Sequence, residues 1–449
     1  MNKFLETLKN IWKIEDLRKK ILYTLSLVLI YRIGTFIVLP GIDPTILAGL
    51  ESTNSGQGLL DLLNMFVGGS FLRGSVFALG IMPYISASIA MQLLTLAVPT
   101  FQKLQKEGES GRKKITQWTR ILTIVVTIVQ GVGYVTFLQT QAGAAIALEN
   151  PFLFGLSTIV VLTAGTVFCM WLGEKITDRG IGNGISILIM IGIIATLPFG
   201  LSAEIRERIG GGGGLITLLI EGIILIAIVF ITVMLVQGVR RIAVQYARRV
   251  VGNRQFGGVR QFIPLRVNAS GVMPIIFAQA LMFIPSIAGQ IFSDTAWGQS
   301  LATGNYYNSF WYNAMFFLLI VLFTYFYTAL IINPDQMADD MKRNNGFIPG
   351  VKPGKPTAEY IDNILSKITL PGSVFLGLIA ILPVFARKAG VNPVFAEFFG
   401  GTSLLILVAV VLDTLQQVES HLLMRHYDGL MEGSSRIKGR AAGAVGASV

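Results

Sequence analysis

Gly80-Ile81-Met82-Pro83-Tyr84-Ile85-Ser86-Ala87 is echoed later in the chain by Gly271-Val272-Met273-Pro274-Ile275-Ile276-Phe277-Ala278. Each copy lies in the second of five consecutive apolar segments, so the echo predicts two halves of five helices each. Because five crossings are an odd number, the second half should be inverted relative to the first, about a pseudo-two-fold axis in the membrane plane. A match of this length also arises by chance in apolar sequence, and the echo alone leaves both explanations open.

The apolar segments indicate that a bilayer is the main solvent of this chain. Hydrophobic residues make up 53% of the 449 residues and charged residues 14%, with a mean hydropathy of +0.65, whereas a soluble domain carries roughly 25% charged residues. A spanning helix needs about 20 mostly apolar residues. Segments of this kind lie at 21–39, 74–98, 118–138, 153–172, 183–200, 215–237, 269–292, 309–332, 367–385 and 400–420. The sequence therefore predicts an all-α integral membrane protein with ten transmembrane helices.

The basic residues lie in alternate loops, and this bias predicts the orientation. Thirty of the 36 Lys and Arg residues fall in the segments on the N-terminal side, at 1–20, 99–120, 173–182, 238–268, 333–367 and 422–449. Cytoplasmic loops carry an excess of Lys and Arg, so both ends of the chain are expected in the cytoplasm. The predicted parts are an amphipathic N-terminus at 1–20, helical halves at 21–209 and 210–430, and a disordered tail at 431–449.

Residue patterns typical of enzymes are missing from the sequence. Cys169 is the only cysteine, and His421 and His426 are the only histidines, so neither a disulfide nor a zinc site is expected. The stretch 349–357 faintly resembles a phosphate-binding loop, but its glycine spacing is one residue short and proline follows the lysine. We therefore expect no catalytic residues, no metal and no cofactor.

Secondary transport is the main alternative, since inverted halves are common in transporters. Ion-coupled transporters place ionisable groups near the middle of the bilayer. Here Glu174, Glu221 and Asp413 lie near the ends of predicted helices, where local pairing or snorkelling explains them better, and Arg32 is the one charge deep in a span. A membrane scaffold without transport is a third possibility.

Two predicted cytoplasmic loops are longer than a connection requires. The loop at 238–268 carries seven arginines interleaved with aromatic residues, which suits RNA phosphates or an acidic protein; contact with anionic lipid is the alternative. The loop at 333–367 contains several Gly and Pro residues, which predict a rigid projecting hairpin.

On the outer side, residues 41–73 contain a short apolar run between glycines at 59–67. A helix of this length reaches only about 12 Å and cannot span a bilayer. It either folds back into the membrane or lies at the interface as a cover.

Several motifs together resemble the bacterial SecY family. They are Arg32-Ile33-Gly34, Pro40-Gly41-Ile42-Asp43, residues 78–89, residues 106–114, Trp171-Leu172-Gly173-Glu174, residues 179–186 and residues 400–406. The resemblance covers roughly residues 10–430, with the motifs in the family's order. It implies a protein-conducting channel: two five-helix halves around an hourglass pore, which passes unfolded secretory chains outward and releases apolar segments sideways into lipid.

The resemblance also implies roles for individual residues. The pore constriction would be a ring formed by Ile81, Ile85, Ile185, Ile189, Ile276 and Ile406. The plug that closes it would be the segment 59–67, with Leu59, Leu60, Leu62, Leu63, Met65 and Phe66. A lateral gate would be lined by Ser86, Gln92, Gln130 and Gln279. Without the resemblance, isoleucines at helical spacing are better explained as ordinary packing residues, and each amide could equally satisfy its own neighbours.

Partners are implied in the same way. The two long loops would dock the ribosome or the SecA motor through Arg240, Arg241, Arg248, Arg249, Arg254 and Lys352. SecE and SecG would be companion subunits, with SecDF and YidC as further partners, secretory and membrane proteins as substrates, and membrane lipids around the channel. Lys352 stands where the family usually has arginine, and this change keeps the charge but loses the bidentate fork. The expected location is the bacterial cytoplasmic membrane.

Overall fold

The computed structural model describes residues 14–43, 46–47, 64–141, 146, 150–210, 214–246, 249–251, 254–256, 260–279, 281–282 and 309–434. The helices are α2 (Glu15–Gly34), α5 (Met82–Ala97), α6 (Pro99–Lys106), α7 (Glu109–Gln141), α8 (Pro151–Arg179), α9 (Gly184–Ile209), α10 (Gly214–Gln237), α13 (Phe310–Ile331), α14 (Pro334–Arg343), α15 (Lys355–Lys388), α16 (Pro393–Ala396) and α17 (Gly401–Ser434). Among the described residues, seven helices are long and apolar enough to cross a membrane, and the bent pair α5–α6 would make an eighth. The predicted all-α membrane architecture is therefore confirmed, while the seventh predicted span, 269–292, lies partly outside the described residues.

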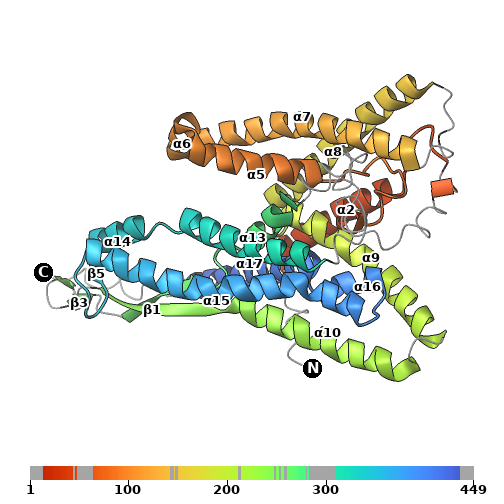
Figure 1. The fold of residues 1–449 in the computed structure, drawn as a ribbon. Coiled ribbons are helices and arrows are strands. Elements are labelled where there is room, and N and C mark those ends of the chain that lie inside the picture. Colours follow the sequence, from red (N-terminus) through yellow and green to blue (C-terminus); the bar gives the residue numbers. More distant parts are fainter. Residues whose placement is uncertain are drawn as a thin grey trace, which may run out of the picture.

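The helices pack as two groups that meet along the middle of the molecule (Figure 1). In the first group, α5 packs on α7, α7 on α8, and α8 on both α2 and α9. In the second group, α13 packs on α15, α15 on α17, and α17 on α10. Contacts of α9 with α10 and α17 join the groups. The groups correspond to the two predicted halves of the sequence.

The echoed motifs have the same local structure in both halves. Gly80 and Gly271 both adopt positive φ, at 51° and 64°, a region that glycine enters without a steric penalty. In each case a helix begins two residues later, at Met82 and at Met273, with proline as its second residue. Proline fits there because the first turn of a helix leaves its N–H groups unbonded. The shared backbone favours a true repeat over a chance match.

Several predicted boundaries were wrong. The second span was expected to begin at 74, but residues 67–81 form turns and α5 begins at Met82, because Gly68, Gly69, Gly74 and Gly80 take up positive φ. The first span was placed at 21–39, whereas α2 runs from Glu15 to Gly34. The loops at 99–120 and 173–182 are largely helical, because α7 and α8 extend beyond their apolar windows and the short helix α6 lies within the first of these loops.

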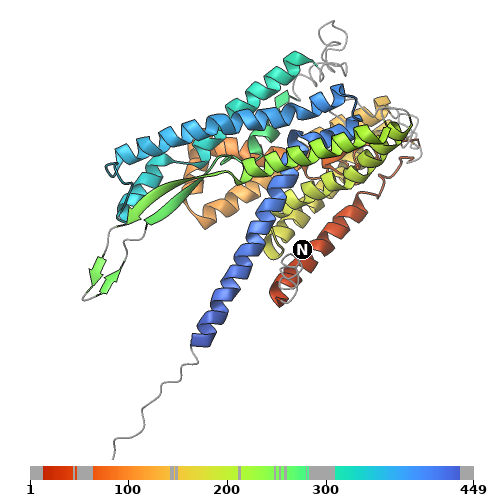
Figure 2. The ribbon, with the colours of Figure 1, turned by 90° about the horizontal axis from the view of Figure 1, so that it is seen from below.

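A small β-sheet lies at one end of the helices, and we call this end the sheet end. Strand β1 (Val239–Tyr246) pairs antiparallel with β4 (Arg260–Arg266) from Val239 opposite Arg266, and its other edge pairs with β5 (Gly346–Phe347). Strands β2 (Arg249–Val251) and β3 (Arg254–Phe256) form a separate hairpin that projects beyond the bundle in Figure 2. The expected hairpin at 333–367 was wrong. Its residues form α14, β5 and the start of α15, and they bury Met341, Ile348 and Ile361 against β1 and β4.

Candidate functional site

The six isoleucines predicted as a ring lie in one hydrophobic cluster, which we call the central cluster. They come from four separate stretches: the start of α5, the start of α9, the helix at 273–279, and the start of α17. Ile81, Ile189 and Ile406 are buried, with exposed fractions of 4%, 6% and 3%, and the other three pack against them half-buried. The tertiary structure thus brings together residues that are up to about 325 positions apart.

A tight turn between α8 and α9 sets the position of two of these isoleucines. Gly182 has a φ of 79°, and the Asn183 side chain caps α9 by accepting hydrogen bonds from the backbone of Ile185 and Ser186 at 3.1 and 3.4 Å. A Cβ at Gly184 would lie 2.0 Å from the carbonyl oxygen of Gly173, so only glycine allows α8 and α9 to approach this closely. The predicted structural role of the glycine-rich stretch 180–184 is confirmed.

The described end of the predicted plug segment packs into the central cluster. Met65, Phe66 and Val67 are buried there, with exposed fractions of 4%, 7% and 2%. Leu59, Leu60, Leu62 and Leu63 lie outside the described residues. Of the two placements considered for the segment 59–67, its described end therefore agrees with folding back between the helices, not with lying on the surface.

Arg32 bonds to the backbone directly after the segment 59–67. Its Nη1 donates a hydrogen bond of 3.0 Å to the carbonyl oxygen of Gly68, whose φ is 70°. A Cβ at Gly192 would lie 2.3 Å from the carbonyl oxygen of Phe66, so the segment runs against the backbone of α9. The guanidinium also stacks on Phe36 at 5.0 Å from the ring centre. Arg32 was expected deep in the first span, but it lies in the last turn of α2 and bonds to a backbone carbonyl oxygen.

The two halves also contact each other through α5 and α13. We call this contact, formed by Ile89, Gln92, Phe277 and Tyr327, the gate face. The Tyr327 hydroxyl donates a hydrogen bond of 3.2 Å to Gln92 Oε1, and the rings of Phe277 and Tyr327 lie 5.0 Å apart. Ile89, Phe277 and Tyr327 form a buried cluster here. Tyr327 was missed from the sequence, although a tyrosine inside an apolar span needs a hydrogen-bond partner.

The other predicted gate residues behave differently. Ser86 donates its hydroxyl to the carbonyl oxygen of Met82 at 3.2 Å, within its own helix. Gln130 is half-buried on α7. Gln279 is 8% exposed and lines a small cavity with Asn313 and Arg387, inside the second half. In the part of the chain described, Gln92 is thus the one predicted gate residue seen bonding to the opposite half.

The predicted docking residues gather at the sheet end. Arg240 and Arg241 are exposed on β1, and Lys352 is exposed in the turn before α15. Arg249 and Arg254 belong to the projecting strands β2 and β3, and Arg248 lies outside the described residues. The turn at Lys352 is fixed by a 2.8 Å hydrogen bond from the Thr357 hydroxyl to the Lys352 carbonyl oxygen.

Charged residues within the helices pair near helix ends. Glu174 accepts two hydrogen bonds from Arg120, at 2.9 and 2.8 Å, and Glu221 accepts one from Arg208 at 2.5 Å. The local pairing predicted for both glutamates is confirmed. Arg208 was missed from the sequence as the partner of Glu221, because the two residues lie on separate helices, α9 and α10.

Comparison with known proteins identifies the family. The family model described as SecY matches residues 75–415. The chain belongs to the SecY family. It is 45% identical over 434 residues to the protein translocase subunit SecY of Streptomyces scabiei, covering 94% of this chain and 98% of that protein. The resemblance noted in the sequence is confirmed.

Solved structures with the same fold agree with this membership. One is a SecY protein whose plug domain is described as stabilising the closed state of the translocation channel and maintaining a membrane seal; it has a TM-score of 0.58 at 20% identity, over 89% of this chain and 91% of that one. Another is Sec61 in the canine ribosome-channel complex from the endoplasmic reticulum, with a TM-score of 0.57 at 18% identity, over 89% and 91%. Together with the apolar helices, they show a multi-pass membrane protein of this fold.

Proposed function

We propose that this protein is the channel subunit of a protein translocase, which passes unfolded secretory chains across the membrane and releases apolar segments sideways into the lipid. The observation that carries the proposal is the central cluster, in which six isoleucines from both halves pack together with Met65 and Phe66. It has the composition expected of a sealed constriction. The channel has no catalytic role of its own, so energy must come from a partner or from the membrane potential.

An apolar constriction suits this task for two reasons. A narrow ring of branched aliphatic side chains excludes water and ions by dewetting. The same side chains offer a passing polypeptide no hydrogen bonds, so the ring does not select for particular residues. We assign the ring to Ile81, Ile85, Ile185, Ile189, Ile276 and Ile406, and the plug to the segment 59–67.

The gate face suits sideways release. Its one described hydrogen bond between the halves joins two neutral groups, Gln92 and Tyr327. Hydrogen bonds between membrane helices contribute about 0.6 kcal/mol on average, so an arriving apolar helix can replace this contact at little cost. Gln130 and Gln279 remain candidates for contacts made as the gate opens.

The sheet end is the proposed docking surface. Exposed Arg240, Arg241 and Lys352 form a basic surface beyond the helices, as expected for contact with ribosomal RNA or an acidic motor protein. A related channel has been solved in complex with a ribosome. We place this end and both termini in the bacterial cytoplasm, with SecE, SecG and SecA as partners.

A trapped secretory chain tests the central assignment. A photoreactive residue at Ile85 or Ile276 should crosslink to a polypeptide stalled halfway through export. Ile226, on the outward face of α10 and 69% exposed, is the matched control and should crosslink to lipid instead. Equal crosslinking at all three positions, or none at Ile85 and Ile276, would rule out this pore.

A further inference from the structure

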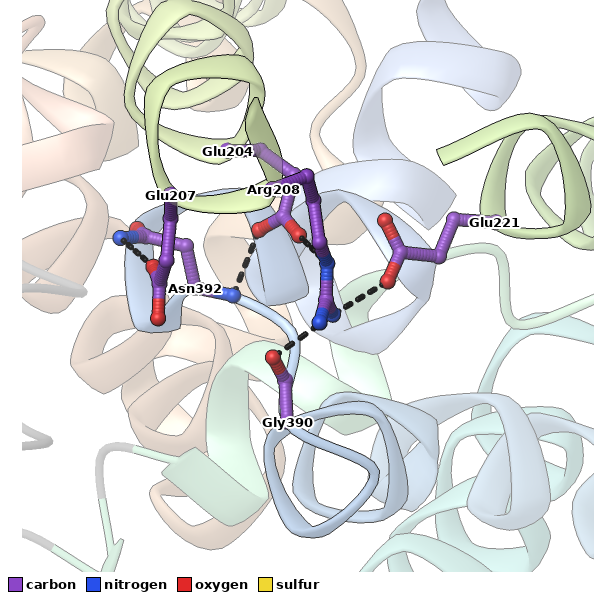
Figure 3. Close-up of polar contacts among 6 residues, drawn as sticks. All are labelled: Glu204, Glu207, Arg208, Glu221, Gly390 and Asn392. Carbon is purple, nitrogen blue, oxygen red and sulfur yellow. Dashed lines mark hydrogen bonds and ion pairs between the residues drawn. The ribbon is translucent and has the colours of Figure 1, made fainter. Parts of the chain in front are cut away.

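A group of charged and polar residues, with three buried charges at its centre, joins three parts of the chain at the end of the bundle opposite the sheet (Figure 1). Figure 3 shows the contacts within this group. We call it the Arg208 cluster. It contains Glu204, Glu207 and Arg208 from α9, Glu221 from α10, and Gly390 and Asn392 from the connection between α15 and α16. It therefore links the last helix of the first half to two elements of the second.

Arg208 is the centre of the cluster. Its Nε donates to Glu204 Oε1 at 2.7 Å, and its Nη2 donates to Glu221 Oε1 at 2.5 Å and to the Gly390 carbonyl oxygen at 2.7 Å. The planar guanidinium thus bonds to its own helix and to two other elements at once, which the ammonium of a lysine could not do in the same geometry.

Two glutamates of α9 also bond to Asn392, which directly precedes α16. Glu204 Oε2 accepts a hydrogen bond of 2.7 Å from the backbone N–H of Asn392, and Glu207 Oε2 accepts one of 3.1 Å from the Asn392 side chain. The Asn392 side-chain oxygen caps α16 by accepting from the backbone of Val394 at 3.1 Å. The position of α16 is therefore tied to the end of α9.

The surroundings make these bonds strong. Glu204, Arg208 and Glu221 are 0%, 8% and 6% exposed. Beside Glu204 lies a cavity of about 170 Å³ whose other walls include Leu197, Leu218 and Phe395. Apolar walls keep the local dielectric low, and charge-assisted hydrogen bonds are roughly twice as strong as neutral ones. By contrast, the described hydrogen bond across the gate face is neutral and 3.2 Å long.

The polypeptide connection between α9 and α10 does not itself fix how these two helices are placed. Residues 210–214, which connect α9 to α10, are all glycine, the residue with the least restricted backbone. The relative placement of α9 and α10 must therefore come from noncovalent contacts, and the Arg208 cluster supplies charged ones at this point.

We propose that Arg208 is a positioning residue that clamps the two halves together at this end, so that they separate at the gate face and stay joined at α9, α10 and α16. The proposal rests on the proposed channel function, because it concerns how the two halves move. It assigns the two interfaces different strengths: charged and buried at the Arg208 cluster, neutral at the gate face.

The test measures the distance between the halves directly. In a background with Cys169→Ala, nitroxide labels are attached at Val129→Cys on α7 and Leu322→Cys on α13, which are 67% and 53% exposed. Spin–spin distances are then recorded in lipid nanodiscs without any substrate. Arg208→Met should broaden the distribution relative to wild type, and Arg206→Gln, an exposed arginine on the same helix, should leave it unchanged.

Two further variants keep the test decisive if Arg208→Met does not fold. The triple change Glu204→Gln, Arg208→Met and Glu221→Gln removes the three buried charges of the clamp together, while Arg208→Lys keeps the charge but loses the fork. Both should broaden the distances, and export of a substrate with a weakened signal should rise several-fold. Wild-type distances in a folded triple variant would overturn the clamp. Broader distances with unchanged export would support the clamp and count against the proposed channel function.

Discussion

The hydroxyl of Tyr327 on α13 donates a 3.2 Å hydrogen bond to the side-chain oxygen of Gln92 on α5, and so joins the two halves of the molecule across the gate face. The two residues lie in different halves of the sequence, and Tyr327 is 2% exposed. The contact is a single neutral hydrogen bond within a cluster of aromatic and aliphatic side chains.

Removing this hydrogen bond should make the gate easier to open. Tyr327→Phe keeps the ring that packs on Phe277 and deletes only the hydroxyl. With a contribution of about 0.6 kcal/mol, we expect export of substrates with weakened signals to rise about threefold. Tyr325→Phe, on the exposed side of the same helix, is the control. Export that rises equally in both variants would separate the effect from the hydrogen bond.

A polar residue in the central cluster should weaken the seal. Ile406→Asn or Ile85→Asn places an amide where dewetting excludes ions, so we expect ion conductance in planar bilayers and looser substrate selection. Ile406→Leu, which keeps the site apolar, should remain closed. Unchanged conductance and export in both asparagine variants would count against the pore assignment.

A side chain at Gly68 should loosen the base of the plug segment. Its φ of 70° is strained for alanine, and a Cβ would lie 2.8 Å from Arg32 Nη1 and 3.2 Å from the Gly192 Cα. Arg32 can move aside only by giving up its hydrogen bond to Gly68. We expect Gly68→Ala to lower stability by about 2–3 kcal/mol, measured by thermal unfolding in detergent, and to raise resting conductance.

Gly350→Ala separates the effect of backbone strain from the effect of the contact with Arg32. Gly350 also has positive φ, 86°, but a Cβ at this position would have no neighbouring atom within 4 Å. It should show only the backbone strain, about 1 kcal/mol, with no change in conductance. Equal losses in the two variants would mean that the contact with Arg32 contributes nothing.

Reversing charge at the sheet end should weaken docking. Arg240→Glu combined with Arg241→Glu places two exposed carboxylates on β1, so we expect affinity for ribosomes or for the motor to fall at least about tenfold at low salt, with a smaller loss at high salt because ions screen these contacts. Lys388→Glu, exposed at the far end of α15, should bind normally. Binding is measured by cosedimentation over a salt series, and wild-type affinity in the double variant would contradict the proposed surface.

Much of the architecture could be predicted from the sequence because lipid imposes simple rules. Residues 215–237 are almost entirely apolar, with Glu221 as their only charged residue, so they must be helical, and α10 begins and ends within a residue of the prediction. Helix ends were harder to predict. Residues 74–81 are as apolar as a span, but four glycines at positive φ hold residues 67–81 in turns.

Side-chain partnerships between different helices could not be predicted from spacing. The sequence predicts Arg208 in the outer connection after a span ending at 200 and Glu221 near the end of the next span, and it gives no indication that Gly390 lies within reach of the same guanidinium. Likewise Tyr327 and Gln92 are separated by 235 positions. Such pairs depend on how helices rotate and tilt against one another.

The sequence by itself determined that this chain crosses a bilayer many times, which of its loops are basic, and, through its motifs, which family it resembles, because hydropathy, charge and local motifs are properties of neighbouring residues. Only the tertiary structure decided that six isoleucines from four stretches meet in one cluster, and that Arg208 ties α9 to α10 and to the connection between α15 and α16. Those facts depend on contacts between segments distant in the chain, which packing sets and local sequence does not.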